Sequence, residues 1–279
     1  MRIYIMTDQE GVAGVIDSDD YCAPDRRYYE TARELLTLEV NAAIEGAIEA
    51  GATEFLVVDG HGHGSINPQL LHRRARLFAG RPMGYPFLCD RGFAAAFSVG
   101  QHAKANTKGA HLCHTGSFNQ EELLINDLSV GEMGINFLFT GYFGVPHILL
   151  TGDKAACEEA RALVPNIVTA AVKEGFQQRS SVGLTGGQNK VFNGAAVHLH
   201  PQVARELIHR AAKEAVQRVA EIKPFVLEPP YELVSVLRPD RPGGERSVAV
   251  CRADDLLELL TMPRRHEVEK NAARYLQRD

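Results

Sequence analysis

The stretch EFLVVDGHGHG, residues 54–64, joins a short apolar run to a glycine-rich turn. The apolar run predicts a buried strand over 54–58, because about four to eight such residues before a turn signal are typical of a strand in a sheet core. Upstream, residues 28–50 carry apolar side chains at helical spacing, and residues 2–7 predict another strand. Strand, helix and strand in this order predict one βαβ unit of a parallel sheet.

The alternation of strands and helices continues along the chain. The further predicted elements are strands over 75–78, 94–99, 147–151 and 166–172, helices over 132–143 and 154–163, and a short helix opened by Asn67-Pro68. Residues 100–120 carry three histidines and little periodicity, which indicates a loop of functional length. We therefore predict an α/β fold whose mainly parallel sheet has helices on both faces.

The pattern changes after about residue 175. A helix is predicted over 201–222, and two strands over 231–237 and 247–251. In a chain of 279 residues this change predicts two domains, because single cores rarely grow much larger than this. Residues 1–175 are predicted to form a catalytic, metal-binding α/β domain, and residues 176–279 a smaller C-terminal α+β lobe.

Composition excludes several classes of function. The formal net charge of -5, without a stripe of lysine and arginine, gives no footprint for nucleic acid or for an anionic membrane surface. No apolar run is long enough for a membrane span or for the core of a signal peptide. The five cysteines form no CxxC pair, so we expect a reducing cytoplasm. A small or peptide-like substrate fits this composition best.

Metal-ligand side chains follow three of the predicted strands. Asp8 and Glu10 follow the first strand, His61 follows the strand at 54–58, and His102 follows the strand at 94–99. The carboxyl ends of parallel strands meet at one edge of a sheet, so these groups are expected to converge. In an extended chain Asp8 and Glu10 point to the same side, where two carboxylates repel unless a cation lies between them.

Glu132, at the start of a predicted helix, is the fifth candidate ligand. Carboxylate oxygen and imidazole nitrogen without thiolate suit zinc, manganese or cobalt. Each residue also has a plainer role open to it, since an acid can cap a helix and a histidine can bond to a turn or sit satisfied in the core. Convergence at successive strand ends favours a site for two divalent ions, because independent structural roles would not require it.

The same residues lie in longer motifs that match a known family. The motifs are MTDQEGVAG (6–14), VDGH (58–61), GQHAK (100–104), HT (114–115), INDLSVGEMGIN (125–136), TAAVK (169–173) and RS (179–180). In these the chain resembles the DppA-like D-aminopeptidases, the M55 family of metallopeptidases, over most of its first 180 residues. Several motifs in the same order and at the same spacing identify a family far more specifically than any single motif does.

The resemblance implies a role for each candidate residue. It implies that Asp8 bridges two zinc ions, one of which is completed by Glu10 and His61. The other ion is then completed by His102 and Glu132. It also implies that His114 is the catalytic side chain, which could hydrogen-bond an oxyanion or pass a proton to the leaving amine.

The resemblance also implies a biological setting. Family members are cytoplasmic aminopeptidases that act on short peptides, including peptides with D-amino acids, and they assemble as homo-oligomers of pentameric rings or decamers. The C-terminal lobe is then expected to serve oligomerisation and line an inner chamber. His63 and the loop 117–124 depart from the family pattern, so stereochemical preference stays open.

Three other readings of the motifs remain open from sequence. Ser98 in AFSVG, residues 96–100, loosely matches a nucleophile elbow and would make a serine hydrolase. The turn at 60–64 would suit a non-catalytic metal- or nucleotide-binding module, although Ser65 replaces the third glycine of the dinucleotide fingerprint. His111, three residues before His114, would pair with it inside the loop.

Overall fold

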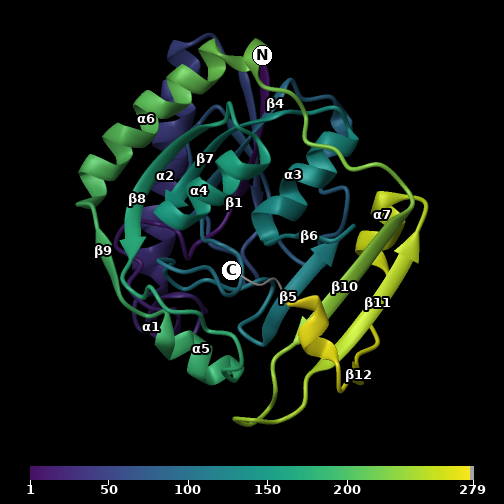
Figure 1. The fold of residues 1–279 in the computed structure, drawn as a ribbon. Helices are drawn as coiled ribbons and strands as arrows, with labels where there is room; N and C mark the ends of the chain where they lie inside the picture. The colour runs from purple at the N-terminus through teal and green to yellow at the C-terminus, as the bar shows by residue number, and fades with distance from the viewer. Residues whose placement is uncertain (277–279) are drawn as a thin grey trace.

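A seven-stranded sheet forms the centre of the computed structural model, which describes residues 1–276 (Figure 1). Its strand order is β3-β2-β1-β4-β7-β8-β9, and all neighbours are parallel except β8 and β9. Thr7 lies opposite both Asp59 and Val99, so the ends of the three central strands are level. The strands are β1 (Arg2–Thr7), β2 (Glu54–Asp59), β3 (Ala75–Phe78), β4 (Ala95–Gln101), β7 (His147–Asp153), β8 (Val168–Gly175) and β9 (Ala196–His198).

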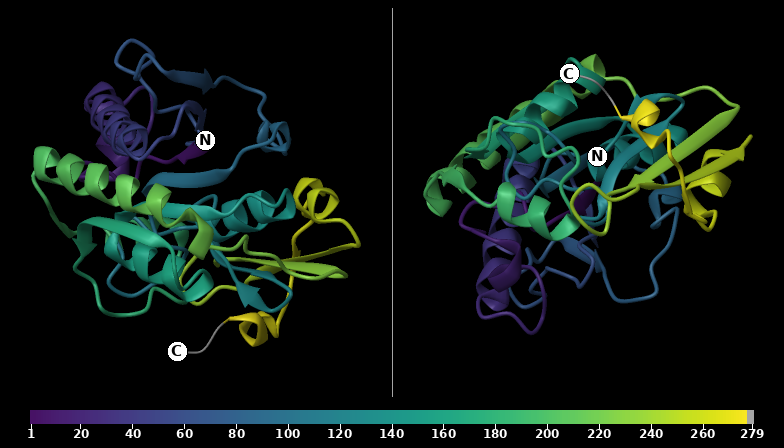
Figure 2. Two further views of the ribbon diagram at one scale, coloured as in Figure 1. Left: turned by 90° about the horizontal axis from the view of Figure 1, so that it is seen from above. Right: turned by 60° about the horizontal axis from the view of Figure 1, so that its bottom comes forward.

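Helices cover both faces of this sheet. The long helices α2 (Tyr29–Glu49) and α6 (Pro201–Gln217) pack on each other and on one face, whereas α3 (Glu132–Tyr142) and α4 (Lys154–Leu163) cover the other. Figure 2 shows α2 and α6 on the side of the molecule away from the yellow C-terminal elements. Crossovers that run in opposite directions from β1 and β4 place their helices on opposite faces, because both are right-handed. The predicted α/β fold is confirmed.

Alternate side chains of β1 pack in two different hydrophobic clusters. Ile3 and Ile5 pack in the cluster that contains α2, while Tyr4 and Met6 pack in a second cluster with α3. All four side chains are buried, as expected for a parallel strand with both faces covered.

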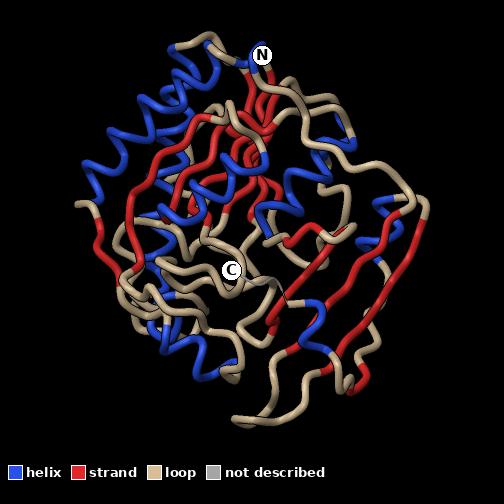
Figure 3. Tube along the Cα trace, in the orientation of Figure 1, coloured by secondary structure: helices blue, strands red, loops and turns tan. Residues whose placement is uncertain are grey.

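A second, antiparallel sheet lies beside the first, and Figure 3 shows it as a separate group of red strands. Its order is β12-β11-β10-β5-β6, and α7 (Leu256–Thr261) packs against β10 and β11. Leu123 of β5 and Leu233 of β10 share the cluster that contains Tyr4, which joins the two sheets. The strands are β5 (Gln120–Ile125), β6 (Leu128–Ser129), β10 (Tyr231–Leu237), β11 (Ser247–Ala253) and β12 (Glu267–Val268).

The two sheets are interleaved along the chain. β5 and β6 lie between β4 and α3 in the sequence but belong to the second sheet. After β8 the chain continues with β9, which belongs to the first sheet, and α6, which packs on it. The predicted boundary at residue 175 therefore does not coincide with the division between the sheets. The assignment of domains 1–175 and 176–279 stays a prediction, and the last three residues of the second lie outside the described range.

Two predicted helices differ from the structure. The short helix at Asn67 is a turn, because the amides of Leu70 and Leu71 both donate to the Asn67 carbonyl and the helix is not continued. The helix predicted over 201–222 ends at Gln217. Short elements that were not predicted are α1 (Ser18–Tyr21), α5 (Gly186–Phe192), α7, β5, β6, β9, β12 and the 3-10 turns Cys89–Arg91, Val219–Glu221 and Ala272–Tyr275.

None of the helices in the described range has both the length and the apolar content that a bilayer span requires. All five cysteines are buried and free of disulfide bonds.

Candidate metal centre

The candidate site lies where the strand order reverses direction. From β1 the chain continues to β2 and β3 on one side, while β4, β7 and β8 lie on the other. Ligands of open α/β sheets bind in the crevice at such a switch point. Asp8 and Glu10 follow β1, His61 follows β2, His102 follows β4, and Glu132 is the first residue of α3. The fold therefore brings all five predicted ligands to one edge.

Two glycines allow the loops after β1 and β4 to touch. Gly100 has a φ of 79°, and a Cβ there would lie 2.1 Å from the carbonyl oxygen of Asp8. A Cβ on Gly11 would lie 2.1 Å from the carbonyl oxygen of Gln101. Any other residue at either position would push the two ligand-bearing loops apart.

The turn that carries His61 is organised by Asp59. The Asp59 carboxylate accepts hydrogen bonds from the Ser65 amide (2.8 Å), the Ser65 hydroxyl (3.1 Å) and the Ile66 amide (3.1 Å). These amides are the donors that a phosphate would need, and a carboxylate already occupies them. The geometry therefore gives no support to a nucleotide-binding module at residues 60–64. His63 is exposed and belongs to neither group of candidate ligands.

The first group of ligand atoms comes from Asp8, Glu10 and His61. The His61 Nδ1 lies 3.3 Å from Asp8 Oδ1 and 3.1 Å from Glu10 Oε2. On the opposite side of the ring, Nε2–H donates to the Cys22 carbonyl at 3.0 Å. The lone pair of a neutral His61 therefore points at two carboxylates, an arrangement that a cation between them stabilises.

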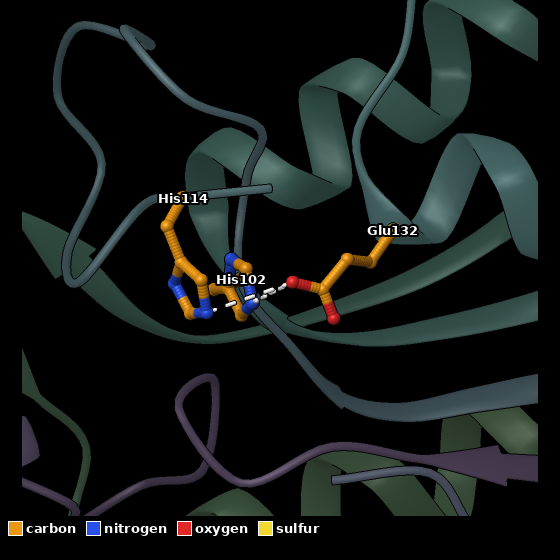
Figure 4. Close-up of side chains that lie close together, drawn as sticks. All are labelled: His102, His114 and Glu132. Atoms are coloured by element: carbon orange, nitrogen blue, oxygen red, sulfur yellow. Dashed lines mark ion pairs between the residues drawn. The ribbon is translucent and has the colours of Figure 1, made fainter. Parts of the chain in front are cut away.

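The second group comes from His102, His114 and Glu132, as Figure 4 shows. Glu132 Oε1 lies 3.6 Å from His102 Nε2 and 3.5 Å from His114 Nε2, so both imidazoles face one carboxylate oxygen. The two rings stack at 4.0 Å. His102 Nε2 is also 3.1 Å from Asp8 Oδ2. Asp8 thus directs one oxygen toward each group, the geometry expected of a bridging ligand.

Backbone hydrogen bonds fix the orientation of these side chains. The Nδ1–H of His102 donates to the Ala103 carbonyl and that of His114 to the Leu112 carbonyl, both at 2.8 Å. Each Nε2 is thereby left with its lone pair toward the site, as in most metal-binding histidines. The Gly116 amide donates to Glu132 Oε1 at 2.7 Å and fixes that carboxylate.

The electrostatics of the site favour bound cations. Burial disfavours charge on His61, yet the Glu10 and Asp8 carboxylates raise its pKa to about 12. Burial would likewise raise the pKa of Glu10, but the adjacent His61 holds it well below its usual value. In the second group, nearby opposite charges again outweigh the effect of burial. Asp8 raises the pKa of His102 well above its usual value. His102 lowers the pKa of Glu132 to about 2. Either protons or metal ions must balance these carboxylates.

Three buried atoms of the site have no hydrogen-bond partner: Asp8 Oδ2, Glu10 Oε2 and His102 Nε2. Buried polar atoms are nearly always hydrogen-bonded, so unmatched atoms that face each other require another partner. The donor set contains oxygen and nitrogen without sulfur, which fits zinc or a similar divalent ion.

Lys173 supports the loop that carries Glu10, and its role was not predicted. It lies on β8, is buried, and its Nζ donates to the carbonyl oxygens of Glu10 and Val15. A lysine at the end of an apolar strand was the sequence signal for such a role. His111 also serves this loop, because its Nε2–H donates to the Ile16 carbonyl at 2.9 Å. The suggested pairing of His111 with His114 is therefore not found.

Ser98 is not placed to act as a nucleophile. It is fully buried in β4, and its hydroxyl donates to His147 Nε2 at 2.9 Å. The Nδ1–H of His147 donates in turn to Thr140 Oγ1, whose own proton goes to the Asn136 carbonyl. Burial lowers the pKa of His147 to about 3, which makes it a poor base at neutral pH. The pair is a satisfied core contact.

Replacing Ser98 with alanine should leave any hydrolytic activity intact and reduce stability. The substitution leaves the buried His147 Nε2 without a donor, which costs about 1–3 kcal/mol. Urea unfolding would measure the loss of stability, and an activity assay on the folded variant would measure its rate of hydrolysis. A folded Ser98→Ala variant without activity would restore the serine mechanism.

A cavity of about 320 Å³ opens onto the candidate metal ligands. Asp8 and Glu132 form part of its wall, and the segment between β3 and β4 forms another part. Its volume lies at the small end of the range for ligand pockets, about 300–1,000 Å³. The remaining lining residues include Arg81, Met83, Tyr85 and Phe87.

Known proteins share both the sequence and the fold. Residues 1–240 match the model of the Peptidase M55 family, described as D-aminopeptidase. A D-aminopeptidase of Bacillus subtilis (strain 168) is 34% identical over 233 residues, which cover 82% of this chain and 78% of that protein. The solved structure of the Zn-dependent D-aminopeptidase DppA from Bacillus subtilis, described as a self-compartmentalizing protease, matches with a TM-score of 0.78 and 28% identity. That match covers 93% of this chain and 94% of the other.

Proposed function

Because the chain belongs to the D-aminopeptidase family M55, we propose that it is a zinc aminopeptidase that removes the N-terminal residue from short peptides. The observation that carries the proposal is the pair of ligand groups that share Asp8 at the switch point of the sheet. The solved relative is described as Zn-dependent, which supports zinc as the metal. The serine-hydrolase and binding-module alternatives are not favoured.

Five residues would hold two zinc ions. Glu10 and His61 would bind one ion, His102 and Glu132 the other, and Asp8 both. Such a pair supplies a Lewis acid for the peptide carbonyl and lowers the pKa of attacking water toward neutrality. The residues themselves keep this site rigid, because each imidazole is fixed by a backbone carbonyl on its far side.

His114 would move the proton that peptide hydrolysis requires. Its Nδ1–H is engaged by the Leu112 carbonyl, so protons can exchange only at Nε2. That atom faces Glu132 Oε1 at 3.5 Å, so protons would move at the edge of the ring that faces the proposed metal pair. A protonated His114 can then hydrogen-bond the developing oxyanion or give its proton to the leaving amine.

The substrate would be a short peptide with a free N-terminus, and we propose a D-configured first residue as the preferred one. The small cavity and the activity after which the family is named support this assignment. Because the solved relative is described as self-compartmentalizing, we propose a homo-oligomer, with pentameric rings or a decamer as the assembly and the C-terminal lobe lining its chamber. A cytoplasmic location would suit the five free cysteines.

The decisive experiment combines metal analysis with a panel of paired D- and L-peptides. We expect two zinc ions per chain, release of the N-terminal amino acid, and loss of activity on chelation that zinc restores. Blocking the N-terminus by acetylation should abolish release. Full activity in metal-free protein, or hydrolysis of none of the peptides by the zinc-loaded protein, would contradict the proposal.

A further inference from the structure

Arg81 places a fixed positive charge in the wall of the cavity. Its Nη2 donates to the His61 carbonyl at 2.6 Å, and its Nη1 donates to the Gly80 carbonyl at 2.9 Å and to Met83 Sδ at 3.0 Å. The first of these contacts ties the guanidinium to the backbone of a proposed metal ligand. The charge therefore lies beside the proposed metal centre.

The guanidinium has no acidic partner within residues 1–276. The acidic residues that line the cavity, Asp8 and Glu132, face the histidines of the metal centre instead. An arginine carries five N–H donors, and the three contacts above leave two of them for a ligand. Paired N–H groups of arginine bind a carboxylate better than any other anion-binding side chain does.

We propose that Arg81 binds the free C-terminal carboxylate of the short peptide substrate. One residue spans at most about 3.3–3.6 Å, so a carboxylate held next to the His61 backbone lies only one or two residues beyond the scissile bond. A longer peptide would place an uncharged amide at this position. This inference rests on the proposed peptidase function and assigns a specificity-determining residue to the same site.

The rest of the wall suits a peptide with apolar side chains. Met83, Tyr85 and Phe87 come from the same segment as Arg81, and Met6 and Ile135 also line the cavity. Apolar walls around an ion pair reduce its screening by water and strengthen it. Arg81 is exposed when no substrate covers it, so its contribution should lie near the lower limit for a charged hydrogen bond.

The test compares one dipeptide from the hydrolysed panel with its C-terminal amide. For the wild type we expect kcat/KM to be about tenfold higher for the acid than for the amide, mainly through KM. In Arg81→Met this ratio should fall toward one. Arg81→Lys keeps the charge without the paired donors and should give an intermediate ratio. Arg76→Met is the matched control, because this exposed arginine of β3 does not line the cavity. The ratio of kcat/KM for acid and amide should stay at the wild-type value in this variant.

Each outcome separates this inference from the proposed function. Equal kcat/KM for acid and amide in the wild type, or an unchanged ratio in both Arg81 variants, would overturn the role of Arg81 and leave the aminopeptidase standing. Hydrolysis of neither compound by the zinc-loaded wild type would overturn the peptidase assignment itself. Zinc content distinguishes a specific effect from damage, because both Arg81 variants should still bind two ions.

Discussion

Replacing Asp8 with alanine should abolish zinc binding and reduce kcat/KM by about three orders of magnitude or more. Asp8 directs Oδ1 toward His61 and Oδ2 toward His102, so one substitution would remove a proposed ligand from both ions. The other two carboxylates of the proposed site are not placed to replace it, because Glu10 already faces His61 and Glu132 already faces His102. Metal analysis and steady-state kinetics on the purified variant would measure both effects.

The same variant makes a second prediction, which concerns stability. In the metal-free protein the Asp8 carboxylate faces His61 and His102 and accepts a hydrogen bond from the buried Gln9 amide, so removing it should lower the stability of the apo form. Added zinc should raise the Tm of the wild type but not that of Asp8→Ala, because only a ligand bound by the folded state stabilises it. Asp25→Ala removes an exposed acid and should behave as the wild type. Zinc-dependent stabilisation of Asp8→Ala would remove Asp8 from the site.

Replacing His114 with alanine should preserve both zinc ions and reduce kcat by about 10²- to 10⁴-fold. Within residues 1–276, its imidazole lies beside the proposed ligands His102 and Glu132 without being part of the proposed ligand set. Its Nε2 is aimed at the same Glu132 oxygen as that of His102, and its other nitrogen is fixed by Leu112. Zinc content and turnover measured on one preparation would test the assignment.

A different result would assign His114 another role. It lies within ligand distance of the second group, so a variant that loses one zinc ion would show it to be a ligand rather than the proton carrier. A variant with both ions and full turnover would exclude it from the chemistry. His63→Ala is the matched control, because this exposed histidine is outside both groups and should keep its metals and its turnover.

The parallel sheet was predictable because its strands are apolar on both faces and end in glycine-rich turns. β5 escaped prediction for the opposite reason, since its first three residues are Gln120, Glu121 and Glu122 and all are buried. Glu121 is neutralised by Arg238 and Arg246, which lie more than a hundred residues away. A local pattern cannot reveal a charge partner that only the folded chain brings near.

The site was predictable to the extent that it depends on strand order. Asp8, His61 and His102 could be placed together because the carboxyl ends of neighbouring parallel strands coincide. Glu132 follows no strand of the parallel sheet directly, so its proposed role rests on the family motif around it. Arg81 had no sequence signal, because it lies in an irregular segment after β3, where its position depends on contacts with His61 and Met83.

The interleaving of the two sheets has a consequence for synthesis on the ribosome. β5 emerges more than a hundred residues before β10, the strand that pairs with it over most of its length. During that interval its edge is unpaired, a condition that invites association with other nascent chains. The pairing of β5 with β10 thus stays incomplete until residue 237 has left the exit tunnel. We expect truncated chains that end near residue 175 to aggregate or be bound by chaperones rather than accumulate as a working half-enzyme.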